Sequence, residues 1–192
     1  MNFLAHAYLS FNDPDILIGN MIADLVKGKQ IEKYSEKIQK GIHIHRQIDS
    51  FTDHHPVTLE AMNLLRPSAG RYAGAFLDVS YDHFLALDKV NEPKEGWQAF
   101  AAECYRQIEL SAEILPSKFC NMFMYMKSEN WFFNYRFNWM IERSFERLQS
   151  RATFLDAETN VFEDYEKHYN EISISYSNFF PELKAFAEGI SL

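Results

Sequence analysis

Apolar residues recur every three or four positions along almost the whole chain, the spacing that places them on one face of an α-helix. Stretches that alternate apolar and polar residues around a tight turn, which would indicate β-hairpins, are nearly missing. Glycine and proline stand between the periodic stretches and mark where one helix ends and the next begins. The pattern predicts an all-α fold.

Capping residues set the expected helix limits in the first half of the chain. A first short helix is expected over residues 2–9. Asp13 supplies an N-cap and Pro14 a first-turn proline for a helix that runs to Val26 and is closed by Gly28. Further helices are expected from Ser35 (its N-cap) to His54, from Pro56 to an interruption at Pro67, and from Arg71 to Asp88.

The second half continues the helical pattern after a turn at Asn91 to Pro93. No linker, repeat or low-complexity segment divides the 192 residues, and 47% hydrophobic content is ample for one core. We therefore predict a single-domain helical bundle over residues 1–192. Helices are expected at residues 95–115, 116–128, 131–150, 157–170 and 178–188.

Composition excludes several classes of protein. The first residues lack a basic leader, and no apolar run reaches membrane-spanning length, so a cytoplasmic protein without membrane contact is expected. Cys104 and Cys120 lie in apolar stretches without a paired-cysteine motif and are expected to be buried free thiols. The sequence does not indicate an oligomeric state.

The net charge of −8 argues against a nucleic-acid-binding protein, which normally carries a basic contact face. The charge is unevenly distributed, because residues 27–46 hold six lysine and arginine residues against two glutamates. This basic segment is either a docking site for an acidic partner or an ordinary solvated surface.

Asp and His residues suited to metal binding are concentrated before residue 90, whereas the second half contains a single histidine, His168. We therefore expect the metal-site motifs in residues 1–90 and a helical scaffold in residues 91–192. Converging imidazole and carboxylate groups are typical ligands of a divalent metal.

The first group of candidates lies on the helix that precedes Pro56. Residues four apart share a helix face, so His45, Asp49 and Asp53 form one stripe. His43 lies about 160° away from His45 around the helix, which favours His45 as a ligand. The alternative is that the two aspartates are surface charges and His45 is a satisfied interior histidine.

The second group contains Asp78, Asp82 and His83, with both carboxylates on one face among residues that should be buried. Buried carboxylates are costly unless they are paired or bound to a metal. The alternative is pairing with an arginine, for which Arg46, Arg66 and Arg71 are available.

Two further polar positions interrupt apolar helices. Asn20 and Asp24 are four residues apart, and His6 lies in the first short helix. Taken alone, such residues often only satisfy neighbouring backbone groups. Four polar stripes in apolar helices together indicate a metal site.

The chain resembles the bacterial acyl carrier protein (ACP) phosphodiesterase, or ACP hydrolase, family, a divergent branch of the HD-domain phosphohydrolases. The resemblance runs essentially end to end. It rests on Asn-Phe-Leu-Ala-His at 2–6, Gly-Asn-Met-Ile-Ala-Asp-Leu-Val-Lys-Gly at 19–28, Gly-Ile-His-Ile-His-Arg-Gln-Ile-Asp-Ser-Phe-Thr-Asp at 41–53 and Leu-Asp-Val-Ser-Tyr-Asp-His-Phe-Leu at 77–85.

The resemblance implies an HD-domain-like helical fold and a divalent metal cofactor, typically Mn2+, with Mg2+ or Fe2+ as alternatives. The implied reaction hydrolyses 4′-phosphopantetheine from the serine of holo acyl carrier protein. One departure matters: the wider superfamily is named for a His-Asp dipeptide, whereas the adjacent pair here is Asp82-His83. The number of metals and the set of direct ligands therefore stay open.

The resemblance carries metal or catalytic roles onto particular residues of this chain. We predict metal ligation by His45, Asp49, Asp78, Asp82 and His6. We predict catalytic roles for Asp24, Arg46 and His83, with Asp24 handling protons and arginine suited to the phosphodiester charge. Lys27, Arg66 and Arg71 are predicted substrate contacts.

Three rival functions can be compared with this prediction. An HD-type nucleotide or small-molecule phosphohydrolase would share the metal chemistry. A di-iron carboxylate bundle needs paired Glu-x-x-His motifs, which this sequence lacks. A non-catalytic helical interaction module would use the same charges and aromatic residues without a metal.

Overall fold

The computed structural model describes residues 1–156 and 159–191. This part of the chain contains eleven α-helices and four short 3-10 helices and no strand, which confirms the all-α prediction. The helices are α1 (Phe3–Tyr8), α2 (Pro14–Ile22), η1 (Ala23–Leu25), η2 (Gly28–Lys33), α3 (Glu36–His54), α4 (Pro56–Ala69), η3 (Gly70–Tyr72), α5 (Ala73–Leu87), α6 (Gly96–Leu110), η4 (Ala112–Ile114), α7 (Ser117–Ser128), α8 (Trp131–Asn134), α9 (Asn138–Gln149), α10 (Val161–Lys167) and α11 (Tyr169–Ser191).

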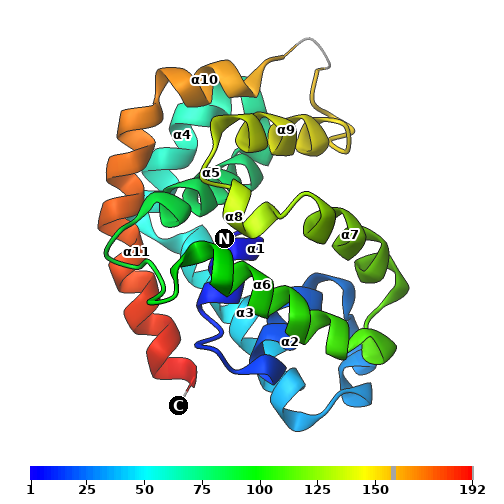
Figure 1. Ribbon diagram of the computed structural model, residues 1–192. Helices are drawn as coiled ribbons and strands as arrows, with labels where there is room; N and C mark the ends of the chain where they lie inside the picture. The colour runs from blue at the N-terminus through cyan, green and yellow to red at the C-terminus, as the bar shows by residue number, and fades with distance from the viewer. Residues whose placement is uncertain (157–158, 192) are drawn as a thin grey trace.

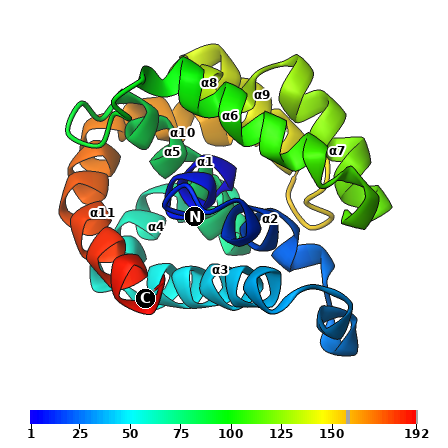
Figure 2. The same ribbon diagram turned by 60° about the horizontal axis from the view of Figure 1, so that its bottom comes forward.

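The short helix α1 lies in the middle of the bundle, enclosed by longer helices (Figure 2). The long helix α11 runs down one side of the molecule, and α6 and α7 cover another (Figure 1). The helices pack around one cluster of buried apolar side chains. Residues of the first short helix are therefore within reach of α2, α3 and α5.

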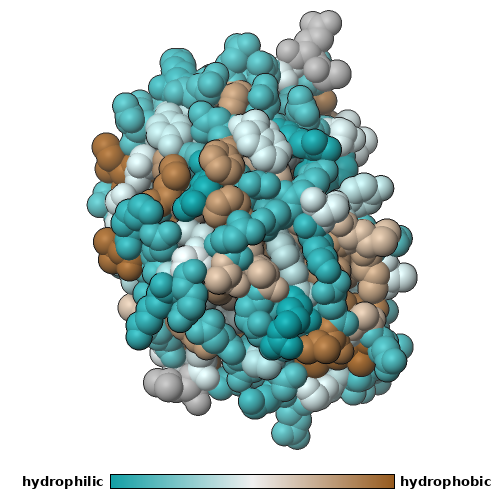
Figure 3. All heavy atoms as spheres, in the orientation of Figure 1, coloured by the Kyte–Doolittle hydropathy of each residue, from teal (hydrophilic) through white to brown (hydrophobic). Residues whose placement is uncertain are grey.

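The second half supplies much of the aromatic core. Phe145 packs edge-on against Phe76, with ring centroids 4.9 Å apart. Of the two free thiols, Cys104 is buried, but Cys120 is only half-buried. The face seen in Figure 3 is mainly hydrophilic, with hydrophobic side chains in small scattered groups.

Two predicted N-caps are confirmed. The Asp13 carboxylate accepts hydrogen bonds from the backbone N–H groups of Asp15 and Ile16, and Pro14 follows as the first helical residue. The Ser35 hydroxyl accepts from the N–H of Ile38. These bonds satisfy donors that a helix start leaves without intrahelical partners.

Several predicted helix limits are wrong. Helix α4 continues through Pro67 to Ala69, because this proline lies in the last turn, where only one helical bond is lost. The helix expected over residues 131–150 is broken into α8 and α9 by an extended residue, Phe137. Helix α11 begins earlier than expected and includes Pro181. The predicted helix start at Ala157 lies outside the described residues.

Helices α2 and α3 cross at two glycines. A Cβ atom on Gly19 would lie 2.3 Å from the backbone oxygen of Ile38, and one on Gly41 would lie 2.6 Å from the backbone oxygen of Ile16. Only glycine permits this approach, which brings the end of α2 beside the metal-site stripe of α3. Of the helices in the described ranges, none combines the length and apolar character of a membrane span.

Candidate metal centre

Three side chains from two helices meet beside the bundle centre. Helix α1 supplies His6, and α3 supplies His45 and Asp49, which are one turn apart on the same face. One ligand atom from each residue lies within 4.8 Å of the others, and this is the metal-compatible group that the described residues contain. We call these three residues the His6–His45–Asp49 group.

The Asp49 carboxylate joins the two imidazoles. His6 Nε2 lies 3.0 Å from Asp49 Oδ1, and His45 Nε2 lies 3.1 Å from Asp49 Oδ2. The two rings are stacked, with centroids 3.9 Å apart and planes 18° from parallel. Both imidazoles are buried, whereas Asp49 keeps 36% of its side chain exposed. The group is thus a nearly buried site with one side open to solvent.

The hydrogen bonding of the two imidazoles is incomplete. Both ring nitrogens of His45 and Nδ1 of His6 are buried without a hydrogen-bond partner among the described residues. The His45 contacts with carboxylates lie within ion-pair distance, but their angles do not make hydrogen bonds. Buried polar atoms normally have partners, so these imidazole nitrogens fit a site that binds a metal ion.

A divalent ion fits this donor set. Neighbouring ligands of an octahedral ion with bonds of about 2.1 Å lie about 3 Å apart. The Asp49 oxygens lie 3.0 and 3.1 Å from the two imidazole nitrogens. Two imidazoles and one carboxylate suit manganese, iron and zinc.

Burial and charge act in opposite directions on the histidines. Burial, together with the charge on His45, lowers the pKa of His6 to about 4, although the Asp49 carboxylate opposes this shift. Burial also lowers the pKa of His45, but the carboxylates of Asp24 and Asp49 outweigh it and raise the value to about 9. Although burial opposes it, contact with His45 and His6 holds the pKa of Asp49 far below its usual range. Without metal, His45 is therefore the cation that balances the carboxylates.

The solvent side of the group is formed by the end of α2 and the segment after it. Asp24 in η1 is exposed, and its Oδ1 lies 3.3 Å from His45 Nε2. This contact with His45 lowers the pKa of Asp24. The exposed Arg46 donates from Nη2 to the backbone oxygen of Val26 at 2.8 Å, and the exposed Lys27 follows directly. The structure thus brings Asp24 to the edge of the group and ties Arg46 to the segment that follows Asp24 and contains Lys27.

Asp78 lies on the α5 side of the same region. Its Oδ1 is 3.0 Å from the amino group of Met1, which is also 3.6 Å from Asp49 Oδ1. Burial lowers the pKa of this amino group, but the two carboxylates raise it to about 10. Asp78 and Asp49 therefore face one common position from two helices.

Asp82 is turned toward the backbone of α1. Its Oδ2 accepts from the N–H of Leu4 at 2.7 Å, and its Oδ1 accepts from the N–H of Ala5 at 3.1 Å. Its side chain is fully buried, and burial raises its pKa to about 7. The structure does not bring Asp82 into the His6–His45–Asp49 group.

His83 is separated from the group and lies among aromatic rings. Its Nδ1 donates to the backbone oxygen of Tyr135 at 2.7 Å, which fixes that nitrogen as the protonated one. Burial lowers the pKa of His83, which favours the neutral ring. In the neutral ring Nε2 is unprotonated and accepts from the hydroxyl of Tyr169 at 2.8 Å. Both ring nitrogens are therefore used by the protein.

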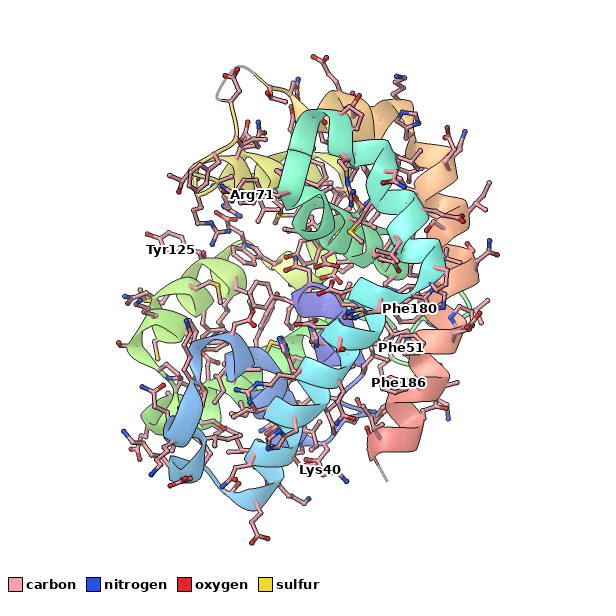
Figure 4. The ribbon with its side chains drawn as sticks, turned by 180° about the vertical axis from the view of Figure 1, so that it is seen from behind. Lys40, Phe51, Arg71, Tyr125, Phe180 and Phe186 are labelled. Carbon is pink, nitrogen blue, oxygen red and sulfur yellow. The ribbon has the colours of Figure 1, made fainter. Side chains whose placement is uncertain are left out.

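Arg66 and Arg71 are exposed at the end of α4 and in η3. The Arg71 guanidinium lies over the ring of Phe154, 3.8 Å from its centroid. In Figure 4, Arg71 and Tyr125 of α7 lie on the same side of the molecule, away from the stacked Phe51 and Phe186 between α3 and α11. The structure does not bring either arginine into contact with the His6–His45–Asp49 group.

A pocket of about 840 Å³ lies elsewhere, between the α1–α2 corner, α6 and α11. Phe11, Phe100 and Lys184 contribute to its walls, and no predicted site residue lines it. The metal-compatible group and this pocket are therefore separate features.

Sequence reasoning missed one polar residue beside the group. The Ser10 hydroxyl donates to the backbone oxygen of His6 at 2.8 Å and accepts from Asn20 Nδ2 at 2.8 Å. Asn20 Nδ2 also approaches the His6 oxygen, at 3.2 Å. The available signal was the four-residue spacing of His6 and Ser10, which places a hydroxyl over the preceding helical turn.

Comparisons with known proteins agree with the family resemblance. A family model described as acyl carrier protein phosphodiesterase matches residues 1–183. The chain is 33% identical over 193 residues to the acyl carrier protein phosphodiesterase of Enterobacter sp. (strain 638), covering 100% of both chains. It is 34% identical to proteins of the same name from Photorhabdus laumondii subsp. laumondii, over 98% of this chain and 96% of the relative, and from Escherichia coli O9:H4 (strain HS), over 97% of both.

The comparison with solved structures gave no match. Full-length similarity to the curated relatives, together with a family match over nearly the whole chain, is sufficient to assign the family. The chain belongs to the acyl carrier protein phosphodiesterase family.

Proposed function

We propose that this protein is a metal-dependent phosphodiesterase that hydrolyses 4′-phosphopantetheine from holo acyl carrier protein and leaves the apo carrier protein. The observation that carries the proposal is the His6–His45–Asp49 group, in which three buried imidazole nitrogens make no hydrogen bond within the described residues. The names of the full-length relatives supply the substrate class. The proposal includes a cytoplasmic location for this enzyme.

His6, His45 and Asp49 would hold the metal, for which we propose Mn2+. Asp78 is a further candidate, because it faces the same position as Asp49. When bound, a divalent ion supplies Lewis acidity: it holds a phosphoryl oxygen and lowers the pKa of a water molecule.

Asp24 is the proposed proton-handling residue. Its exposed carboxylate stands at the edge of the group, and its lowered pKa keeps it ionised near neutral pH. An ionised carboxylate in that position can accept the proton of the attacking water. The proton later reaches the serine oxygen that leaves.

Arg46 is the proposed contact for the phosphodiester charge. One of its N–H groups is held by the Val26 carbonyl, which fixes the guanidinium beside the group and leaves its other donors available. Arginine matches two phosphoryl oxygens with two parallel hydrogen bonds. Arg66 and Arg71 stay predicted substrate contacts, and His83 stays a predicted catalytic residue.

The carrier protein is proposed to dock on the segment after Asp24. Lys27, Lys29 and Lys33 are exposed in this segment and make no ion pair with the described residues. Carrier proteins are acidic, so this local positive charge would attract the substrate to an enzyme with a net charge of −8. Docking there places the substrate beside the edge formed by Asp24 and Arg46.

The test uses metal-stripped protein and holo acyl carrier protein, with the carrier's intact mass as the readout. Manganese-dependent loss of the whole phosphopantetheine group is expected from the wild type. Asp49→Asn should lose this activity, whereas Asp53→Asn, an exposed aspartate one turn further along α3, should keep it. An unchanged carrier mass together with hydrolysis of nucleotides would select the nucleotide phosphohydrolase instead.

A further inference from the structure

The short helix that carries His6 depends on other helices for its position. Helix α1 has only six residues, and its N-cap residue Asn2 makes no side-chain capping bond. An isolated helix of this length is unstable in water, because nucleation is costly and few intrahelical bonds follow. The position of the His6 imidazole is therefore fixed by contacts from outside α1.

Asp82 supplies such a contact at the start of α1. It reaches across from α5, 77 residues away from Ala5 in sequence, and each of its two oxygens accepts one backbone N–H of the first helical turn. These donors are otherwise free at a helix start, and a negative charge there is favoured by the helix dipole. The carboxylate thus performs the capping that Asn2 does not.

The other end of α1 is fixed by a second buried polar contact. Asn20 of α2 and Ser10 both hydrogen-bond to the backbone oxygen of His6. His6 therefore lies between two anchors, one from α5 and one from α2. These anchors bind only the backbone, so the His6 imidazole contacts Asp49 and stacks on the ring of His45.

We propose that Asp82 is a positioning residue that acts through α1 to place His6 in the metal centre, and not a metal ligand. This inference rests on the proposed metal-dependent function. Asp49 has an oxygen facing each histidine and an exposed edge, whereas both Asp82 oxygens are occupied by backbone donors in the interior. A carboxylate in this position cannot turn toward a metal without releasing the start of α1.

The first experiment measures amide hydrogen exchange in metal-free protein. Asp82→Asn keeps the shape of the side chain but puts an amide donor against a backbone donor. Because the oxygen of the new amide can still accept from one N–H group only, exchange at Leu4, at Ala5 or at both should become faster by about tenfold or more, the size expected for losing a hydrogen bond to a charged group. Asp49→Asn, which alters the metal centre and leaves the hydrogen bonds of Asp82 in place, should leave exchange at these two amides unchanged.

Asp88→Asn is the control for general loss of stability. Asp88 follows the last residue of α5 and accepts hydrogen bonds from Val90 and Tyr176, and none of its hydrogen bonds within the described residues comes from the start of α1. This variant should change neither exchange at Leu4 and Ala5 nor the affinity for manganese. Unchanged exchange at these amides in Asp82→Asn would overturn the anchoring role.

The second experiment is a double-mutant cycle read by manganese affinity. Asp82→Asn should weaken manganese binding by about 10- to 100-fold, as residues that orient ligands commonly do. If Asp82 acts through His6, this loss should disappear in a His6→Gln background. A loss that persists in that background would show that Asp82 ligates the metal, and would overturn the proposal.

The two experiments separate the inference from the proposed function. A wild-type protein that binds no manganese, magnesium or iron would overturn the metal-dependent function itself. Metal binding by the wild type with no effect of Asp82→Asn would overturn only the positioning role.

Discussion

Substituting Gly19 by alanine is predicted to push α2 away from α3 and so to disturb the metal centre without touching a ligand. An added Cβ would lie 2.3 Å from the Ile38 backbone oxygen and 2.7 Å from the Gly41 Cα. Ordinary contacts begin at 3.4 Å, so the helices must separate by roughly 1 Å. Both obstacles are backbone atoms, and no side-chain rotation can relieve the overlap.

The expected loss of stability follows from two opposing effects. Overpacking a close contact costs about 1–3 kcal/mol, and this site lies at the upper end because backbone must move. Alanine in a helix gains up to about 1 kcal/mol over glycine. The net loss is about 2 kcal/mol, which lowers the Tm of a chain of this length by about 4–8 °C.

Urea unfolding followed by circular dichroism measures this loss, with manganese affinity as a second readout. Gly189→Ala is the matched control, because Gly189 lies in α11 with no atom within 4 Å of an added Cβ. It should be neutral or stabilising by up to about 1 kcal/mol. A Gly19→Ala protein as stable as the Gly189→Ala protein, with unchanged metal affinity, would refute the close crossing of α2 and α3.

Four further predictions concern the reaction and its control by pH and charge. Metal binding must displace the proton that Asp24 and Asp49 hold on His45, whose pKa is raised to about 9, while His6 with a pKa of about 4 is already neutral. The apparent Kd for manganese, measured by titration, should therefore rise about tenfold for each unit by which the pH falls between 8 and 6. A plot of log Kd against pH whose slope has a magnitude of zero or two would contradict this. In metal-free protein, protonated His45 stabilises the folded state, and this contribution is complete below about pH 6.5. Urea unfolding should show that the contribution is lost as the pH rises through about 9. Asp24→Asn should lower kcat by about 10²- to 10⁴-fold in steady-state assays with little change in KM, and an unchanged kcat would remove Asp24 from proton transfer. Lys27→Glu should raise KM for the carrier protein by about tenfold at low salt, and the difference from wild type should shrink at high salt; equal KM values at low salt would exclude docking there.

Local signals in the sequence were sufficient for most of the helices. Asp13, Pro14 and Ser35 mark helix starts through backbone bonding that involves only neighbouring residues, and the structure has these caps. Proline was a poorer guide at Pro67, where an interruption was predicted but α4 continues, whereas Pro181 lies inside a helix as expected. Packing of the flanking turns against the core outweighs the single bond that each proline removes.

The His45–Asp49 pair was also within reach of the sequence, because a four-residue spacing fixes the shared face of a helix. The hydrogen-bond partners of Asp82 and His83 could not be predicted from the sequence. Two residues adjacent in sequence point in different directions from α5, one to the α1 backbone and one to the Tyr135 carbonyl. That choice is set by which helices lie on each side of α5, and helix periodicity alone contains no such information.

The HD-domain-like architecture stays a prediction from the family resemblance. The described residues support an all-helical bundle with α1 at its centre (Figure 2). The position of α1 matters for the account, because it brings His6 to the stripe on α3 from a helix far too short to stand alone.

The most direct test of the proposed metal centre is a crystal structure of the manganese-loaded protein with anomalous scattering recorded near the manganese edge. We expect one anomalous peak bound by His6, His45 and Asp49, with Asp82 still bonded to the backbone of Leu4 and Ala5. A peak on other residues, or no peak from protein that hydrolyses holo acyl carrier protein, would contradict it.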